Sequence, residues 1–275
     1  MALALGSSIA WGTADFFGGA VSRRLPVLSV TLISQAAGLA GLLVVFAVRG
    51  GAFDDRSLGI GLVSGLCGGI GLLCFYRALA LGTMSVVSPL AACGAIVPLV
   101  LALATGERPS AATLAGVVLA LAGAVLAAME ERRAEAPARR RAVAIAIVAA
   151  VALGAFIYFL GRSARHGDTL SALLSARLGS LSLLAAAALV IRPPVEGPPS
   201  RWLPVAGIGL LDVAANGLFA LASTRGLLAV ASVLGSLYPV TTVLLAHVVL
   251  GERVSTVQRA GVGLALVGVA VISAG

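Results

Sequence analysis

The chain has 275 residues, of which 60% are hydrophobic and only 11% are charged. A soluble domain has about a quarter of its residues charged, so this composition excludes a water-soluble fold and indicates a protein surrounded by lipid. The net charge of +8 comes from Arg without any Lys, and the arginines lie singly or in short clusters between apolar segments. This distribution is typical of membrane topology signals and not of a nucleic-acid-binding surface, so we expect no nucleic-acid partner.

A helix needs about 20 apolar residues to cross the hydrocarbon core, and ten segments of the sequence meet or approach that length. In chain order they cover residues 2–21, 26–48, 57–80, 83–104, 111–129, 142–161, 168–191, 202–224, 227–249 and 256–274. None of them alternates polar and apolar residues as a barrel strand would. The sequence therefore predicts an all-α integral membrane protein with ten transmembrane helices.

The longest hydrophilic stretch, residues 130–141, lies between the fifth and sixth segments. It predicts an N-terminal five-helix repeat over residues 1–129, a charged linker over 130–141 and a C-terminal five-helix repeat over 142–275. The pattern Gly-Glu-Arg-x-Ser follows the fourth helix of each half, at Gly106 and at Gly251, an offset of 145 residues (251 − 106). Because five is an odd number, the second repeat enters the membrane from the opposite side, and inverted repeats are typical of alternating-access transporters.

Several short motifs along the chain carry a resemblance to a known family. They are Trp11-Gly12 in the first segment, Tyr76-Arg77-Ala78-Leu79 before Gly82, Pro89, Tyr238-Pro239, and the glutamates Glu107 and Glu252 of the two Gly-Glu-Arg motifs. In these residues the chain resembles the drug/metabolite transporter superfamily, specifically its ten-helix EamA-type members. The resemblance implies two five-helix bundles around a central cavity and the transport of small metabolites or drugs. Asp15 departs from the family pattern, so the resemblance transfers no particular substrate.

Charged side chains inside a membrane span are costly and mark functional positions. Asp15, Arg177, Asp212 and His247 lie well inside predicted spans. At about 1.5 Å of rise per residue and a core about 30 Å thick, the first three fall within several ångströms of the midplane, where a transporter binds its substrate. Asp15 is a proton-coupling carboxylate, a counter-charge for a cationic substrate or a member of a structural ion pair. Arg177 either clamps a carboxylate or phosphate or pairs with Asp15 or Asp212, and we expect a structural role for His247.

Two uncharged polar residues extend this predicted site. Asn216 follows Asp212 by four residues, so the two side chains share one helix face. They either line a hydrated cavity or form hydrogen bonds between helices. Gln35 is the counterpart of Arg177 when the two halves are aligned.

Aromatic residues and prolines mark the predicted cavity less specifically. Tyr158 and Tyr238 either line the cavity or pack between helices. Pro89, Pro98 and Pro239 interrupt the backbone hydrogen bonds of the fourth and ninth segments. Because broken helices often border substrate sites, these two segments are expected to lie beside the cavity.

Residues at the predicted membrane edges are expected to be structural. Arg77 can extend its side chain to the interface, and Glu107 and Glu252 belong to turns that end helices. The Arg-rich connections, which include residues 23–24 and 130–141, all belong to one side, so the positive-inside rule places that side in the cytoplasm and both termini outside. The family resemblance implies the opposite orientation.

The sequence thus favours a secondary transporter in a bacterial inner membrane. It would move a small metabolite or drug, of amino acid-like or amine type, by alternating access as a proton-linked exporter, acting as a monomer or homodimer without a cofactor. The alternative is a non-transporting membrane scaffold or a channel. An enzyme is not expected, because the sequence contains neither the Gly-x-Ser-x-Gly nor the His-Glu-x-x-His motif and has no metal-ligand spacing.

Overall fold

A computed structural model of the chain describes residues 1–49, 53–128, 136–195, 198–252 and 255–274. Every regular element in these ranges is helical. The helices before the middle of the chain are α1 (Ala2–Ser22), α2 (Val27–Arg49), α3 (Leu58–Leu81), α4 (Met84–Ala92), α5 (Ile96–Ala104) and α6 (Ala111–Ala128). Those after it are α7 (Ala136–His166), α8 (Thr169–Ile191), α9 (Leu203–Thr224), α10 (Leu228–Gly235), α11 (Tyr238–Leu250) and α12 (Thr256–Ala274). The predicted all-α class is confirmed.

Seven helical stretches in the described part of the chain are long and apolar enough to cross a membrane. They are 27–49, 55–81, 84–104, 140–166, 169–191, 199–224 and 228–250. The other three predicted spans form the helices α1, α6 and α12, which are not among these seven stretches, and for α6 and α12 the criterion covers only part of each helix. The structure therefore confirms a multi-span helical protein, and the count of ten spans stays a prediction.

Helix α7 is longer at both ends than the predicted segment 142–161. It begins at Ala136 and ends at His166, so the described residues 136–141 of the predicted linker form its first turns. Ala and Arg are strong helix formers, which explains why a charged stretch continues the helix. Residues 129–135 of the predicted linker lie outside the described residues.

Two of the long stretches are interrupted, as the prolines predict. The stretch 84–104 divides into α4, a 3₁₀ turn at Cys93–Ala95 and α5, with Pro89 inside α4. The stretch 228–250 divides into α10 and α11, and Pro239 lies in the first turn of α11. A proline has no N–H to donate and fits the first turn of a helix, where that donor is not needed.

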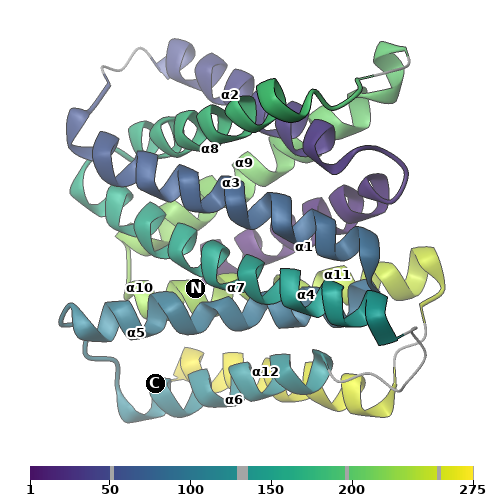
Figure 1. Cartoon of the computed structure of the whole chain (residues 1–275). Helices are drawn as coiled ribbons and strands as arrows, with labels where there is room; N and C mark the ends of the chain where they lie inside the picture. Colours follow the sequence, from purple (N-terminus) through teal and green to yellow (C-terminus); the bar gives the residue numbers. More distant parts are fainter. Residues whose placement is uncertain (50–52, 129–135, 196–197, 253–254, 275) are drawn as a thin grey trace.

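The two halves of the chain interleave and do not form separate units. In Figure 1 the helices run side to side, with α6 and α12 paired at the bottom. Helix α1 packs on α9 and α11, α3 packs on α7 and α8, and α6 packs on α12. The connections after α5, α7 and α9 lie at the left of Figure 1, and those after α1, α3, α8 and α11 lie at the right. The bundle thus has two opposite ends, called here the α9–α10 end and the α3–α4 end.

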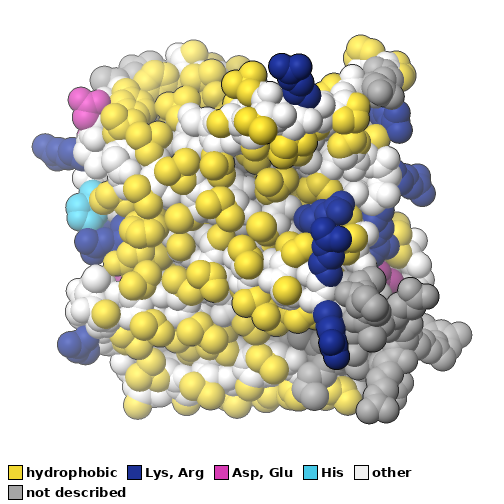
Figure 2. Space-filling model, in the orientation of Figure 1, with side chains coloured by type: hydrophobic (Ala, Val, Ile, Leu, Met, Phe, Trp, Pro, Cys, Tyr) yellow, Lys and Arg dark blue, Asp and Glu magenta, His cyan; other side chains and the backbone are white. Residues whose placement is uncertain are grey.

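The outer surface is suited to lipid. Figure 2 shows hydrophobic side chains across the middle of the visible face, with arginines along the left edge and on the right-hand side. Large apolar side chains are widely exposed, for example Val48 and Val190, which are 85% and 84% exposed. The buried polar residues, in contrast, gather inside the bundle, where the predicted site lies.

Candidate functional site

A cavity of about 690 Å³ lies inside the bundle and is lined from seven helices. Six of the seven predicted substrate or coupling residues line it: Asp15, Gln35, Arg177, Asp212, Asn216 and Tyr238. They come from α1, α2, α8, α9 and α11, so the fold brings together residues far apart in the sequence.

Arg177 is held by partners on two other helices. Its side chain is buried, and it donates from Nη2 to Asp212 Oδ2 at 2.5 Å and from Nη1 to Gln35 Oε1. Ser180 Oγ also donates to Gln35 Oε1, at 2.9 Å. Of the two carboxylates considered as partners of Arg177, the pair therefore forms with Asp212 and not with Asp15. Its positive charge is compensated within the protein.

The polar chain continues from Asp212 to the first helix. Asn216 Nδ2 donates to Asp212 Oδ2 at 3.2 Å, across the one-turn spacing expected from the sequence. Trp11 Nε1 donates to Asn216 Oδ1 at 2.9 Å, and its ring lies 5.5 Å from that of Phe219. Trp11 thus joins α1 to α9 and also forms part of the cavity wall.

Asp15 is the unpaired charge of the cavity. Its side chain is only 7% exposed, yet it makes no hydrogen bond or ion pair with any described residue. Asp212, Tyr76 and Tyr238 lie within electrostatic range of it. The hydroxyl of Tyr238 is buried and also lacks a hydrogen-bond partner. Two polar groups of this one cavity are therefore without a partner in the described part of the chain.

The remaining walls are apolar and aromatic. Phe75 of α3 contributes one ring, and α7 contributes a stripe at helical spacing formed by Leu153, Phe156, Ile157 and Leu160. Tyr158 is not part of the cavity lining, so of its two alternatives the structure favours packing between helices. Its position lies off that stripe, and its ring packs edge-on against Phe159, with centroids 5.4 Å apart.

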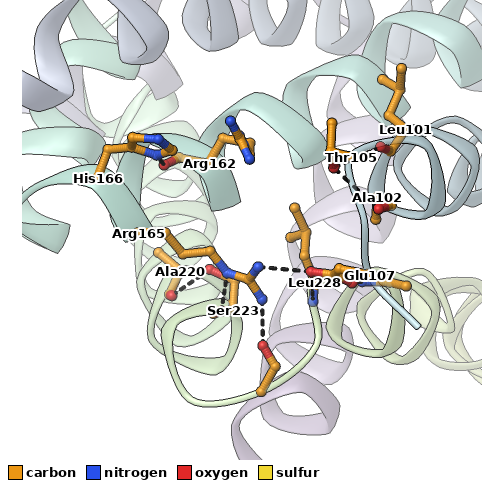
Figure 3. A network of polar contacts seen from close by, with 12 residues as sticks. Leu101, Ala102, Thr105, Glu107, Arg162, Arg165, His166, Ala220, Ser223 and Leu228 are labelled. Atoms are coloured by element: carbon orange, nitrogen blue, oxygen red, sulfur yellow. Dashed lines mark hydrogen bonds and ion pairs between the residues drawn. The ribbon is translucent and has the colours of Figure 1, made fainter. Parts of the chain in front are cut away.

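A polar clamp joins the two halves at the α9–α10 end, and Figure 3 shows it. Arg165 donates from Nε to the Ser223 carbonyl at 2.6 Å, to the Gly226 carbonyl from Nη2, and to Glu107 Oε1 from Nη1 at 2.7 Å. Glu107 also accepts the backbone N–H groups of Leu228 and Ala229, each at 2.9 Å. One glutamate of the N-terminal half therefore caps α10 of the C-terminal half. An open hollow of about 1030 Å³ adjoins this clamp.

A second clamp of the same design lies at the α3–α4 end. Arg23 donates from Nε to the Leu79 carbonyl at 3.3 Å, and from Nη2 to the Gly82 carbonyl at 3.2 Å and Glu252 Oε1 at 3.3 Å. Glu252 accepts the N–H of Ser85 at 3.2 Å and that of Met84 at 3.5 Å. Here a glutamate of the C-terminal half caps α4 of the N-terminal half. Both glutamates were expected to be structural, but their bridging of the two halves was not expected.

Close backbone contacts at the two helix breaks are also alike. A Cβ atom at Gly12 would lie 2.4 Å from the carbonyl oxygen of Tyr238, beside the α10–α11 break. A Cβ atom at Gly154 would lie 2.2 Å from the carbonyl oxygen of Gly94, in the turn between α4 and α5. Real side chains cannot approach this closely, so glycine allows α1 and α7 to pack directly on the broken helices.

Two other charged residues lie apart from the cavity. Arg77 is exposed at the last turns of α3, as expected for a side chain that reaches the interface. The ring Nδ1 of His247 lies 2.8 Å from the Glu252 carbonyl, which gives it a local partner after α11. Within the described residues no cluster of His, Cys, Asp or Glu is arranged to hold a metal ion.

The model of the EamA-like transporter family matches residues 1–129 and 140–274. The chain belongs to the EamA-like transporter family. It is accordingly a multi-pass membrane protein from a family that transports small molecules.

Comparison with solved structures supports the same fold for this EamA-like chain. Among 29 matching chains, one described only as "Crystal structure of protein" is 22% identical, with a TM-score of 0.74. The match covers 97% of this chain and 98% of that chain. At this level of identity the likeness shows the fold alone. Comparison with curated proteins gave no match.

Several features of this EamA-like site were missed in the sequence. The helical periodicity of α7 could have indicated that Phe156 lines the cavity, because Phe156 shares a helix face with Leu153 and Leu160. Ser180 follows Arg177 by three residues on the same face of α8, and its hydroxyl donates to Gln35 Oε1. No local pattern indicates the pairing of Arg23 and Arg165 with glutamates of the other half.

Proposed function

We propose that this EamA-like protein is a secondary transporter that moves a small amine or amino acid-like solute across the membrane by alternating access, linked to protons. The observation that carries the proposal is the central cavity, in which Asp15 is buried and unpaired while the neighbouring charges compensate each other. A buried charge without a partner is costly in a membrane protein and is retained where it binds something.

The two clamps support an arrangement of ten spans in two inverted repeats. Arg165 contacts one carbonyl near the end of α9 and one just after it, Arg23 does the same at α3, and each meets a glutamate from the other half. The clamps lie at opposite ends of the bundle (Figure 1). Repeats related by a twofold axis in the membrane plane would place equivalent contacts on opposite faces.

Unequal packing of equivalent helices supports alternating access. Helix α3 packs more extensively on α7 and α8 than α9 packs on the equivalent α1 and α2. Two symmetric halves would pack equally in a single symmetric state, so the difference is expected of one of two interconverting states. The clamps would then be the contacts that hold each end shut, and each end would open when its glutamate releases the helix that it caps.

Asp15 is the proposed proton-linked group. A proton or a substrate cation could each neutralise its carboxylate, so the two would compete for one position. The charged and titratable groups that face it are Asp212, which is paired with Arg177, and the hydroxyl-bearing Tyr76 and Tyr238. None of these supplies a fixed positive partner to Asp15.

Solute counterflow tests the transporter proposal. Purified protein in liposomes loaded with an unlabelled solute should accumulate the labelled solute transiently, with saturable kinetics. A channel would equilibrate the label without overshoot, and a scaffold would not move it. Either of these results, obtained across a panel of amines and amino acids, would reject the transporter.

A further inference from the structure

We infer that the cavity selects a monovalent organic cation with an apolar or aromatic body, such as a protonated arylalkylamine, with Asp15 as its counter-charge and the Tyr238 hydroxyl as its second polar contact. The inference rests on the proposed function, because it takes the cavity to be the substrate site. It goes further in excluding anions and zwitterions as preferred ligands.

The balance of charge in the cavity argues for a cation. Three charged side chains line it: Asp15, Arg177 and Asp212. Arg177 and Asp212 form an ion pair at 2.5 Å, and Gln35 occupies a further donor of the guanidinium. One negative charge is left. A ligand carboxylate would have to displace Asp212 from Arg177, whereas an ammonium group can meet Asp15 without breaking any contact.

The polar groups of the cavity that lack a partner also indicate where a cation would bind. Asp15 has no hydrogen-bond or ion-pair partner in the described part of the chain, and the buried Tyr238 hydroxyl has none either. The other buried side-chain atoms without a partner, on Ser7, Ser22, Ser88, Ser232 and Trp202, do not belong to the cavity lining. Buried polar groups are normally paired, so these two cavity groups favour a ligand that carries a hydrogen-bond donor.

The walls indicate the rest of the ligand. Phe75, Phe156 and Trp11 present rings to the cavity, together with aliphatic side chains of α7. Aromatic faces attract a cation through their quadrupole and also accommodate a flat apolar body. A small, strongly hydrated cation would leave these walls without contact, so the site fits an amine that carries an aromatic or bulky apolar group.

A matched series of ligands tests the inference by binding alone. The probes are 2-phenylethylammonium, the neutral 2-phenylethanol, the zwitterion phenylalanine and the anion 3-phenylpropionate, which share one ring and a short chain. Trp11 reports on the cavity by its fluorescence once Trp202, the other tryptophan of the chain, is replaced by Phe. We expect 2-phenylethylammonium to bind between about tenfold and a hundredfold more tightly than the other three, the usual value of a hydrogen bond to a charged group.

Variants separate the contribution of Asp15 from general packing. Asp15→Asn should remove the preference for the ammonium over 2-phenylethanol and leave the binding of 2-phenylethanol unchanged, while Asp15→Glu should retain the preference. Asp212→Asn frees Arg177 and should move the preference toward 3-phenylpropionate. If this variant does not fold, the double variant Arg177→Gln/Asp212→Asn, which removes both charges of the pair, should keep the cation preference.

The inference is overturned if phenylalanine or 3-phenylpropionate binds the unaltered protein as tightly as the ammonium, if the ammonium shows no saturable binding, or if Asp15→Asn keeps the preference. These results are independent of transport. Counterflow of a neutral or zwitterionic solute would leave the proposed function standing while the cation inference fails. Selective binding of the ammonium without counterflow would support the cation inference and reject the proposed transport.

Discussion

At the scale of single residues, the polar groups of the site differ in whether they have hydrogen-bond or ion-pair partners. Arg177, Asp212 and Gln35 satisfy one another, and Trp11 holds Asn216 in the same network. Asp15 lies in the same cavity without such support. The network holds the helices around the cavity together, and the unpaired Asp15 carboxylate is the group available to bind a solute.

Removing one member of the buried ion pair should destabilise the protein strongly. Arg177→Gln leaves Asp212 without its cation, and such a loss costs about 3–5 kcal/mol because a buried charge is left uncompensated. The double variant Arg177→Gln/Asp212→Asn should be considerably more stable than Arg177→Gln. Thermal unfolding of the purified proteins measures both, and equal melting temperatures for the single and double variants would contradict the pairing.

Gly12 offers a residue-scale test of the packing of α1. Because a Cβ atom there would lie 2.4 Å from the Tyr238 carbonyl oxygen, Gly12→Ala should push α1 away from the α10–α11 break and lower the melting temperature. Gly207, in the second turn of α9, is a matched control, since a Cβ atom there meets nothing within 4 Å. Equal stability of Gly12→Ala and Gly207→Ala would contradict the close approach.

At the scale of helices, the ends of the elements carry the contacts that join the two halves. Each clamp combines the last turn of one helix, the first turn of the next and a glutamate from the other half. Opening an end of the bundle would require these contacts to separate together. Substitutions in the clamps are therefore the most direct way to test the proposed alternating access.

The two glutamates should control access from opposite ends. Glu107→Gln weakens the clamp at the α9–α10 end, and Glu252→Gln weakens the one at the α3–α4 end. With the three native cysteines replaced and a single Cys at the cavity residue Ala176, an impermeant thiol reagent reports access from each side. Each variant should increase labelling from its own end only. An increase from the same end for both variants would contradict the assignment.

The cap of α8 gives a prediction with a pH dependence. Asp168 accepts the N–H of Ser171 at 3.0 Å and pairs with Arg49 at 2.9 Å. Burial alone would raise the pKa of Asp168, but these hydrogen bonds and the Arg49 charge outweigh it and hold the pKa below its ordinary value. The ionised carboxylate therefore adds stability above the ordinary pKa of Asp, and this stability is lost as the pH falls through the lowered pKa.

Asp168→Ala should accordingly lower the free energy of unfolding by about 1 kcal/mol near neutral pH, the usual value of a helix cap. The difference from the unaltered protein should shrink as the pH falls below the lowered pKa of Asp168. Melting temperatures of the two proteins across an acid series measure it. A difference that stayed constant with pH would show that the cap does not depend on the ionised carboxylate.

Sequence patterns indicated the helices and much of the site because both depend on local chemistry. Apolar length locates the helices, prolines locate the breaks of α4–α5 and α10–α11, and the four-residue spacing joins Asp212 to Asn216. The place of Tyr158 could not be decided from the sequence, because it depends on which face of α7 meets the cavity. The partners of Arg23 and Arg165 could not be inferred, since they depend on how two halves of the chain pack.

At the scale of the whole molecule, the chain is a lipid-facing bundle with an interior polar site and two differently charged ends. The start of α1 and the end of α12 lie toward the left of Figure 1, opposite the end of α6 and the start of α7. It exposes a large apolar surface and encloses a polar network within its hydrophobic core. Membership of the EamA-like transporter family agrees with this organisation.

The distribution of Arg predicts which end faces the cytoplasm. Arg23, Arg24, Arg192 and Arg201 adjoin connections at the end of the bundle where α6 ends and α7 begins. The positive-inside rule places this end in the cytoplasm. A reporter that is active only outside the cytoplasm should therefore be active when it is fused to the C-terminus and inactive when it is inserted between α6 and α7. The reverse pattern would contradict the charge-based orientation.

Asp15 is proposed to bind a cation and a proton alternately in one cavity. Transport driven by a pH gradient tests this coupling. In proteoliposomes, an imposed pH gradient should drive the accumulation of labelled 2-phenylethylammonium. Asp15→Asn should abolish this dependence on the gradient, while Arg177→Gln/Asp212→Asn, which leaves Asp15 in place, should retain it. Transport by Asp15→Asn with an unchanged dependence on the pH gradient would contradict the account.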